Sequence, residues 1–251
     1  MPLIDTLAIT LKSRRWGEAD RIVTFFTLQV GKVRGVARGA RRPKSQFGSG
    51  LEPFVVSRVS LFEKSNDALY RIRHVDIEEP FLALRDNLDR MTAAARLVNV
   101  VAAVTAEGDA DSRIFEALKA GLQAVHWSPD PRMMAVLFQI RILGQTGFRP
   151  QVDLCAGCGK RLERVSRHFS ARSGGMVCAV CLSRQSAPCM LLSAGTLALL
   201  QQAVRLPIPL VSRLRAEGGV RAELEVAIDT FVTVVAGRKM PVVDAWEPRA
   251  R

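Results

Sequence analysis

The chain has 251 residues, of which 48% are hydrophobic and 24% charged, and this amount of apolar material excludes a wholly disordered protein. Its 36 Lys and Arg residues against 24 Asp and Glu residues give a formal net charge of +12, which favours a polyanionic partner, nucleic acid before an anionic membrane. No apolar run approaches the roughly 18 residues of a membrane helix, and the N-terminus lacks the pattern of a secretory signal, so we expect a cytoplasmic protein that does not enter a membrane.

The first part of the chain, residues 1–79, is predicted to form a small β-barrel. Short segments rich in β-branched and aromatic residues alternate there with Gly, Pro and charged clusters. Most of these segments are separated by too few residues for a helix, and their number suits a closed OB-type barrel better than a sandwich of seven or more strands. The five predicted strands cover residues 3–12, 21–28, 32–40, 54–62 and 69–77.

This barrel segment carries a stripe of positive charge. No acidic residue lies between Asp20 and Glu52, an interval that holds seven basic residues. Because side chains alternate along a strand, Lys32, Arg34 and Arg38 are expected on one face. A surface that is merely solvated usually mixes both signs, so the stripe favours phosphate binding with counterion release over simple solvation. The candidate nucleic-acid contacts are Arg14, Arg15, Lys32, Arg34, Arg38, Arg41, Arg42 and Lys44.

The loop that follows the stripe is polar and rich in Gly and Ser, so it is flexible enough to follow a phosphate backbone. Aromatic residues for stacking on bases are few, since the chain has 11 Phe, 3 Trp and 1 Tyr and the barrel core needs several of them. Phe47 is the best stacking candidate among them, but anchoring of the loop is the favoured role for this residue. We therefore expect binding that is mainly electrostatic and tolerant of sequence.

From Pro80 onward the hydrophobic period changes from two to about 3.6 residues, which predicts a helical domain over residues 80–150 and 190–251. Ser112 and Ser193 are expected to cap two of its helices at the N-terminus, and Gly237 is expected to end the last one. The predicted helices cover residues 81–106, 131–146, 194–205 and 220–236, together with a helix after Ser112 whose apolar face runs from Ile114 to Val125.

Residues 151–189 interrupt the helical pattern with the spacing C-x2-C-x19-C-x2-C. Two C-x2-C turns that face each other bring four thiolates into the tetrahedral shell that zinc prefers. A Gly-rich turn at residues 172–175 predicts a hairpin that returns the chain to the second pair. Four sulfur ligands leave no open position, so the zinc is expected to be structural, with one ion per chain. The predicted ligands are Cys155, Cys158, Cys178 and Cys181.

Other interpretations of these cysteines remain open at this stage. A redox or iron–sulfur role and unliganded buried thiols are the two alternatives to zinc, and His168 lies between the pairs, where it could replace one ligand. Cys189 falls outside the pattern and receives no function. The elements together predict an α+β fold, with an N-terminal five-stranded OB-type β-barrel followed by an α-helical domain with an inserted zinc module of four cysteines.

No motif of a common enzyme class is present. The chain lacks a G-x-x-x-x-G-K-[ST] phosphate loop, a G-x-G-x-x-G fingerprint, and the H-E-x-x-H and G-x-S-x-G motifs, and its three histidines are isolated. We therefore expect a protein that is not an enzyme. A zinc-dependent nuclease or hydrolase is the enzymatic alternative, and an RNA- or ribosome-associated protein with an OB-fold and a zinc ribbon is the binding alternative.

Two stretches resemble a known family. Residues 31–45 (GKVRGVARGARRPKS), followed by LEPF at 51–54, resemble the N-terminal signature of the RecO family of bacterial DNA repair proteins. Residues 138–150 (FQIRILGQTGFRP), which lead into the first cysteine pair, and Gly174-Gly175 before the second pair resemble the helix and zinc region of the same family. The resemblance extends over most of the chain and implies the fold described above.

The resemblance also implies a function. RecO proteins are recombination mediators that bind single- and double-stranded DNA, anneal complementary strands and, with RecR and in some cases RecF, assist RecA loading on DNA coated with single-stranded DNA-binding protein (SSB). The acidic C-terminal tail of SSB ends in Phe, and the family binds it in the helical domain, where Arg132 and Arg141 are candidate carboxylate contacts. Such a protein is cytoplasmic and associated with the nucleoid.

Overall fold

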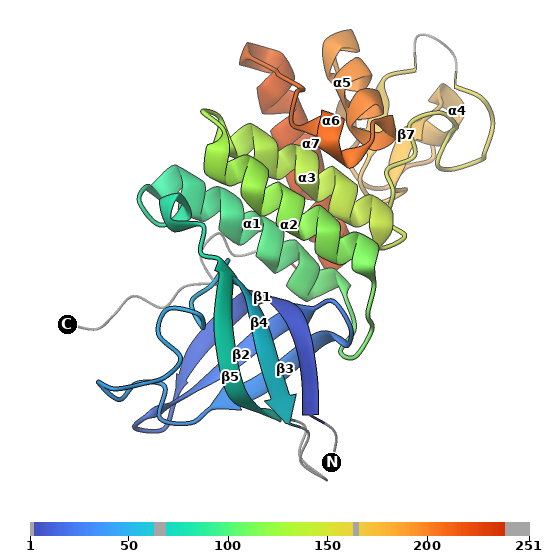
Figure 1. Ribbon diagram of the computed structural model, residues 1–251. Coiled ribbons are helices and arrows are strands. Elements are labelled where there is room, and N and C mark those ends of the chain that lie inside the picture. The colour runs from blue at the N-terminus through green and yellow to red at the C-terminus, as the bar shows by residue number, and fades with distance from the viewer. Residues whose placement is uncertain (1–2, 63–68, 163–165, 239–251) are drawn as a thin grey trace.

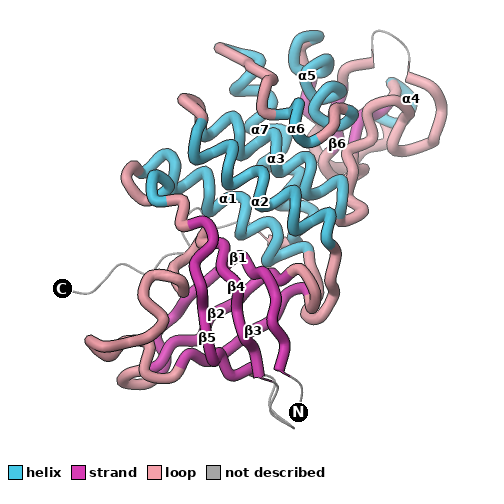
Figure 2. Tube along the Cα trace, in the orientation of Figure 1, coloured by secondary structure: helices cyan, strands magenta, loops and turns pink. Residues whose placement is uncertain are grey.

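The computed structural model describes residues 3–62, 69–162 and 166–238. Figure 1 shows a β-barrel at one end, a layer of helices packed on it, and a cysteine-bearing module beyond the helices. Figure 2 shows the same separation of strands from helices, with long loops concentrated in the barrel and in the module. No helix in these ranges is long and apolar enough to cross a membrane.

The predicted five-stranded barrel is confirmed. It closes in the order β1-β2-β3-β5-β4, with β3 and β5 parallel and the other neighbours antiparallel. The first strand is longer than predicted because its pairing with β2 continues to Trp16, so Arg14 and Arg15 lie in a strand and not in a turn. The strands are β1 (Leu3–Trp16), β2 (Asp20–Thr27), β3 (Gly31–Ala37), β4 (Val56–Phe62) and β5 (Tyr70–Glu79).

A helical bundle covers one end of the barrel (Figure 1). Its central helix, α3, contacts α1, α2, α5 and α7, and nearly all of its side chains from Met133 to Leu143 are buried. The helical elements are η1 (Leu82–Leu84), α1 (Leu88–Val104), α2 (Ser112–Trp127), α3 (Pro131–Gln145), α5 (Ala194–Arg205), α6 (Ile208–Val211) and α7 (Gly218–Ala236).

One predicted helix start and one predicted N-cap are wrong. The prediction of one helix over residues 81–106 fails because Phe81 adopts a left-handed conformation with φ of 43°, and α1 begins only after Asn87, whose side chain accepts a hydrogen bond from the Arg90 N–H. Asp111, and not Ser112, caps α2, because its carboxylate accepts from the Arg113 N–H at 2.8 Å. The predicted cap at Ser193 and the predicted stop at Gly237 are confirmed.

One apolar cluster joins the barrel to the helices. Ile9, Phe26, Phe54 and Val56 of the barrel belong to the same buried cluster as the helix residues, whereas a second cluster fills the barrel interior. Buried side chains therefore attach the barrel to the bundle.

The predicted division of the chain into domains, with residues 1–79, residues 80–150 together with 190–251, and an insertion over residues 151–189, stays a prediction.

Polar contacts also stabilise the junction between the barrel and the helices. The Lys32 ammonium donates to the carbonyl oxygens of Ala102, at 2.7 Å, and of Thr105, which are free at the C-terminal end of α1. Gly31 has φ of +64°, and a Cβ atom there would lie 2.1 Å from the Asp109 carbonyl oxygen, so only glycine fits. The glycine and lysine at residues 31 and 32 thus position the barrel against the α1–α2 loop.

Replacing Lys32 by Met is expected to lower the free energy of unfolding by about 1–3 kcal/mol, because the end of α1 loses a charged hydrogen-bond donor. Urea unfolding followed by circular dichroism measures this change. Lys44→Met is the control, since Lys44 is exposed in a loop and has no ion-pair partner among the described residues. Equal stability of the two variants would contradict a structural role for Lys32.

Candidate metal centre and nucleic-acid interface

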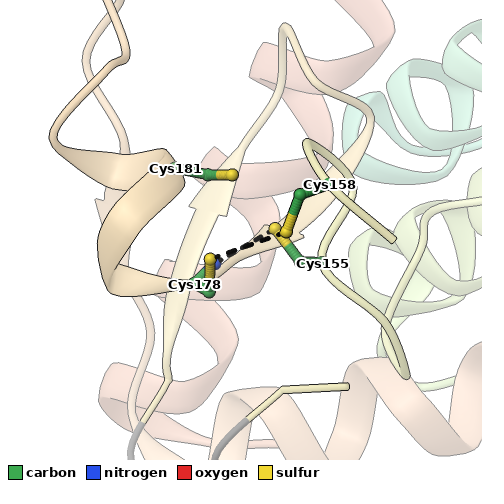
Figure 3. A group of neighbouring side chains, drawn as sticks. All are labelled: Cys155, Cys158, Cys178 and Cys181. Atoms are coloured by element: carbon green, nitrogen blue, oxygen red, sulfur yellow. Dashed lines mark hydrogen bonds between the residues drawn. The ribbon is translucent and has the colours of Figure 1, made fainter. Parts of the chain in front are cut away.

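The four predicted ligands converge. Cys155 and Cys158 lie in the loop after α3, and Cys178 and Cys181 lie at the start of and within α4 (Ala179–Leu182). Their sulfur atoms all lie within 4.8 Å of one another, and Figure 3 shows the side chains gathered from the two segments around one centre. Zn–S bonds of about 2.3 Å in a tetrahedron would separate the sulfurs by about 3.8 Å. The sulfurs of Cys158 and Cys178 are 3.9 Å apart, so the arrangement fits such an ion.

The backbone around the cysteines explains why this loop folds as it does. The Gly159 N–H donates to the Cys155 carbonyl oxygen at 2.8 Å, which closes the first turn, and the Cys178 N–H donates to the Cys155 sulfur at 3.3 Å. Gly157 leaves room beside the cluster, because a Cβ atom there would lie 3.0 Å from the Cys181 sulfur, closer than an ordinary contact. The loop therefore holds the thiols close together through backbone contacts.

The acidity of the thiols reflects this crowding. Burial raises the pKa of Cys155, but hydrogen bonds from the backbone N–H groups of Cys178, Cys158 and Gly157 outweigh burial and lower the pKa to about 6. Hydrogen bonds to the sulfurs of Cys155 and Cys158 raise the pKa of the Cys181 thiol to about 12. Four thiolates in this volume repel one another unless a cation lies between them. A divalent cation removes the repulsion and lets all four lose their protons.

A small sheet carries the module. The strands β6 (His168–Ser170), β7 (Gly175–Val177) and β8 (Met190–Leu191) pair in the order β7-β6-β8, and the predicted hairpin at residues 172–175 is confirmed as the β6–β7 turn. His168 pairs with Val177 in this sheet and is not among the clustered ligands. The ring of Phe169 packs edge-on against Phe231 of α7 at 6.0 Å, so the module is anchored in the main core.

The outer face of β1, β2 and β3 brings several of the predicted DNA contacts together. Arg14 lies opposite Ile22, and Ile22 lies opposite Val36, so one row of side chains crosses three strands. The alternation predicted for β3 is present, since Val33 is buried and Arg34 exposed. Five of the eight predicted contacts are exposed and have no ion pair or side-chain hydrogen bond among the described residues: Arg14, Arg15, Arg38, Arg42 and Lys44.

Three of the predicted contacts have intramolecular partners. Lys32 is bound to the end of α1, as described above. The Arg34 Nε lies 2.9 Å from a carboxylate oxygen of Glu107, and Arg41 donates to the Glu18 carbonyl oxygen at 2.8 Å. Glu107 belongs to the α1–α2 loop, so an acid-free interval in the sequence does not give an acid-free surface. These three cations are less available to a ligand than the five unpaired ones.

The structure also adds basic residues that the sequence analysis missed. Arg71 lies on β5 opposite Val36 of β3, and Arg73 follows on the same strand with its guanidinium carbon 5.5 Å from the centre of the Phe62 ring. Both are exposed on either side of buried Ile72. The Arg-Ile-Arg alternation was a signal for this strand, but only the β3–β5 pairing shows that it continues the basic face. Phe47 is 4% exposed in the barrel core, so it anchors the loop and offers no face to a base.

The two arginines predicted to contact a protein tail lie in different places. Arg132 donates to the Asp89 carboxylate at 2.7 Å, whereas half-buried Arg141 donates to the Val204 carbonyl oxygen at 2.6 Å near the end of α5. Burial lowers the pKa of Arg141, and nearby Arg149 lowers it further. A separate open pocket of about 470 Å³ lies between α2, α3 and α6 and includes Trp127, Phe138 and Arg215.

Comparison with known proteins accounts for nearly the whole chain. The family model Recombination protein O N terminal matches residues 1–81, and Recombination protein O C terminal matches residues 85–242. The chain is 34% identical to a DNA repair protein RecO of Thermoanaerobacter sp. (strain X514), and the match covers 73% of this chain and 73% of the relative. It is 33% identical to that of Alkaliphilus metalliredigens over 71% of this chain and 72% of the relative. It is 28% identical to that of Desulforamulus reducens over 94% of this chain and 91% of the relative. The chain therefore belongs to the RecO family of DNA repair proteins.

Proposed function

We propose that the basic face of the barrel binds the phosphate backbone of single- and double-stranded DNA during repair and recombination. The observation that carries this proposal is the group of unpaired, exposed cations on β1, at the end of β3 and in the loop that follows it: Arg14, Arg15, Arg38, Arg42 and Lys44. OB barrels bind nucleic acids on this side, at the face of strands 2 and 3 and the adjoining loops. Membership of a DNA repair family selects DNA over RNA as the ligand.

The proposed activity is strand annealing without catalysis. Cations that neutralise the phosphates of one strand lower its repulsion of a complementary strand, and a face that contacts mainly phosphates leaves most bases open for pairing. No nucleotide hydrolysis is required. With RecR and RecF, the protein would assist RecA loading on SSB-coated DNA at the nucleoid, as the family resemblance implies.

We propose zinc as the ion held by Cys155, Cys158, Cys178 and Cys181. Four cysteine sulfurs in a tetrahedral arrangement are the ligand set of structural zinc, which would fix the two turns to each other. The cysteines therefore hold the module together and take no part in DNA chemistry.

For the SSB tail, the pocket beside Trp127 is a better proposal than the two arginines named from the sequence. The pocket is apolar along Met134 and Phe138, which suits a Phe ring, and Arg215 at its edge has no carboxylate partner among the described residues. Arg132 is paired with Asp89, and Arg141 binds carbonyl oxygens. Arg215 donates from Nη1 to the carbonyl oxygens of Ser212 and Leu214, and its Nη2 has no hydrogen-bond partner among the described residues. The pocket thus combines an apolar floor with a cation that can still donate to a carboxylate.

The test of the function is annealing of complementary oligonucleotides, bare and SSB-coated, without ATP. We expect the protein to accelerate pairing on both substrates. Tighter binding to a matched RNA, without any effect on SSB-coated DNA, would support an RNA-associated role instead, and metal-dependent cleavage of the DNA would support a nuclease.

Phosphate binding predicts a steep salt dependence. If five cations each contact one phosphate, the logarithm of the affinity for single-stranded DNA should fall with the logarithm of salt concentration with a slope of about −3.5. Fluorescence anisotropy at a series of NaCl concentrations measures the slope. A slope near zero would show that another, uncharged surface binds the DNA.

A further inference from the structure

An exposed tryptophan stands at the edge of the basic face. Trp16, the last residue of β1, is 57% exposed, whereas the aromatic side chains Phe25, Phe26, Phe47 and Phe54 are buried in or beneath the barrel. A single exposed apolar side chain is common on protein surfaces and needs no explanation by itself. Three features distinguish Trp16 from an ordinary exposed side chain: its position at the edge of the basic face, the hydrogen bonds that hold its hairpin in place, and its neighbours.

The hairpin that carries Trp16 is fastened to the next loop of the barrel. Trp16 lies opposite Asp20, whose carboxylate accepts a hydrogen bond from the Gly39 N–H at 2.8 Å. Arg41 donates from its backbone N–H to the Ala19 carbonyl oxygen at 2.9 Å, and from its guanidinium to the Glu18 carbonyl oxygen at 2.8 Å. The tip of the β1–β2 hairpin and the end of β3 therefore form one pre-organised surface, so a ligand bound there would not have to order the hairpin.

The neighbours of Trp16 supply both charge and apolar contact. Arg14 precedes it by two residues and so lies on the same face of β1, about 6.6 Å away along the strand. Beside Arg14, the half-buried side chains of Ile22 and Val36 continue the row with apolar surface. Arg38, exposed just after β3, adds a second cation. One nucleotide could thus place its phosphate on a cation and its base against the indole ring.

Only an unpaired strand can use such a ring. In a duplex the faces of the bases are covered by their neighbours and only their edges are accessible, whereas in a single strand a base face is free to stack on an aromatic side chain. We propose that Trp16 stacks on a base of single-stranded DNA whose phosphates are held by Arg14 and Arg38, and that this contact makes the barrel prefer single strands to duplexes. The inference rests on the proposed DNA binding, and it leaves all but one base free for annealing.

The experiment compares two single strands of equal length and equal phosphate number, oligo(dT) and an abasic strand built of tetrahydrofuran spacers. The wild-type protein is expected to bind oligo(dT) about tenfold more tightly, because stacking on one base is worth roughly this factor or more. Trp16→Ala is expected to lose this difference, binding both strands as the wild type binds the abasic one, and Trp16→Phe to keep part of it. Affinity for duplex DNA should not change in either variant.

Phe148→Ala is the control for the loss of an exposed aromatic side chain, since Phe148 is 43% exposed in the loop after α3, outside the barrel, and should have no effect on either strand. Equal losses on oligo(dT) and on the abasic strand in Trp16→Ala would overturn the inference, because they would indicate a charge or folding effect. An unchanged oligo(dT) affinity would also overturn it, while DNA binding itself would stand. If the wild type bound neither strand, the proposed function would fail together with this inference.

Discussion

If the four cysteines hold zinc as proposed, replacing Cys178 by Ser is expected to abolish zinc binding and to lower the melting temperature by more than about 10 °C. A structural zinc ion contributes about 10 kcal/mol or more to the folding of the segment that it organises, and 1 kcal/mol shifts the melting temperature of a chain of this size by about 2–4 °C. The loss should spread beyond the module, because Phe169 and Met176 belong to the cluster that also contains α3 and α7. Zinc content after extensive dialysis, together with a thermal melt, measures both effects.

Cys189→Ser is the matched control for this experiment. Cys189 is the fifth cysteine of the chain, half-buried and outside the cluster, so the same chemical change there should leave the zinc content at one ion per chain and the melting temperature nearly unchanged. Retention of zinc and of stability by Cys178→Ser would show that the four cysteines do not form the proposed centre. Iron with visible absorbance in the purified wild type would favour the iron–sulfur alternative.

The parts of the fold that were predictable are those with a local physical cause. The alternation of apolar residues in β3 and the spacing of the cysteine pairs each reflect one strand or one turn, and both predictions agree with the structure. Helix starts were less predictable where two capping residues compete. Asp111 and Ser112 are neighbours and both favour the N-cap, and only the structure shows that the carboxylate accepts the backbone hydrogen bond.

The candidate site was harder to predict because its charges are paired over long separations. Lys32 and Arg34 read as two phosphate contacts, yet their partners, Thr105 and Glu107, lie 73 residues further along the chain. Sequence reasoning cannot detect such pairs without knowing that α1 ends against β3. The same limit hid Arg71, which joins the basic face only through the parallel pairing of β3 with β5.

The choice of the best aromatic residue shows a similar limit. Phe47 lies in a polar loop, which made it the best stacking candidate although anchoring was the favoured role, and its burial in the barrel interior agrees with anchoring. Trp16 is exposed because the β1–β2 hairpin extends beyond the predicted strand. Composition therefore located the charged surface, whereas strand length and pairing decide which side chains reach a ligand.

Replacing Arg38 and Arg42 together by Glu is expected to weaken binding to single-stranded DNA by roughly 100-fold or more at about 0.1 M salt. Both side chains are exposed and have no ion-pair partner among the described residues, so they can contact phosphates directly. Each charge-assisted contact is worth about 1.5 kcal/mol or more, and reversal adds repulsion to the loss. Arg34 and Arg41 are left unchanged because Arg34 pairs with Glu107 and Arg41 donates to the β1–β2 hairpin. Replacing them would destabilise the fold, and the loss of affinity could then not be assigned to a lost phosphate contact. Fluorescence anisotropy and an annealing assay measure the effect.

Net charge alone could explain a loss of affinity, so the control must carry the same change in charge. Arg205→Glu with Arg213→Glu meets this condition, because both residues are exposed at or after the end of α5, and the Arg205–Asp153 pair on the surface contributes little to stability. This control should lose only a few-fold in affinity, through the long-range field. If the two double variants lost affinity equally, binding would depend on overall charge and the barrel face would not be the site. A large loss confined to Arg38 and Arg42, with annealing lost in parallel, would assign both binding and strand pairing to the barrel face.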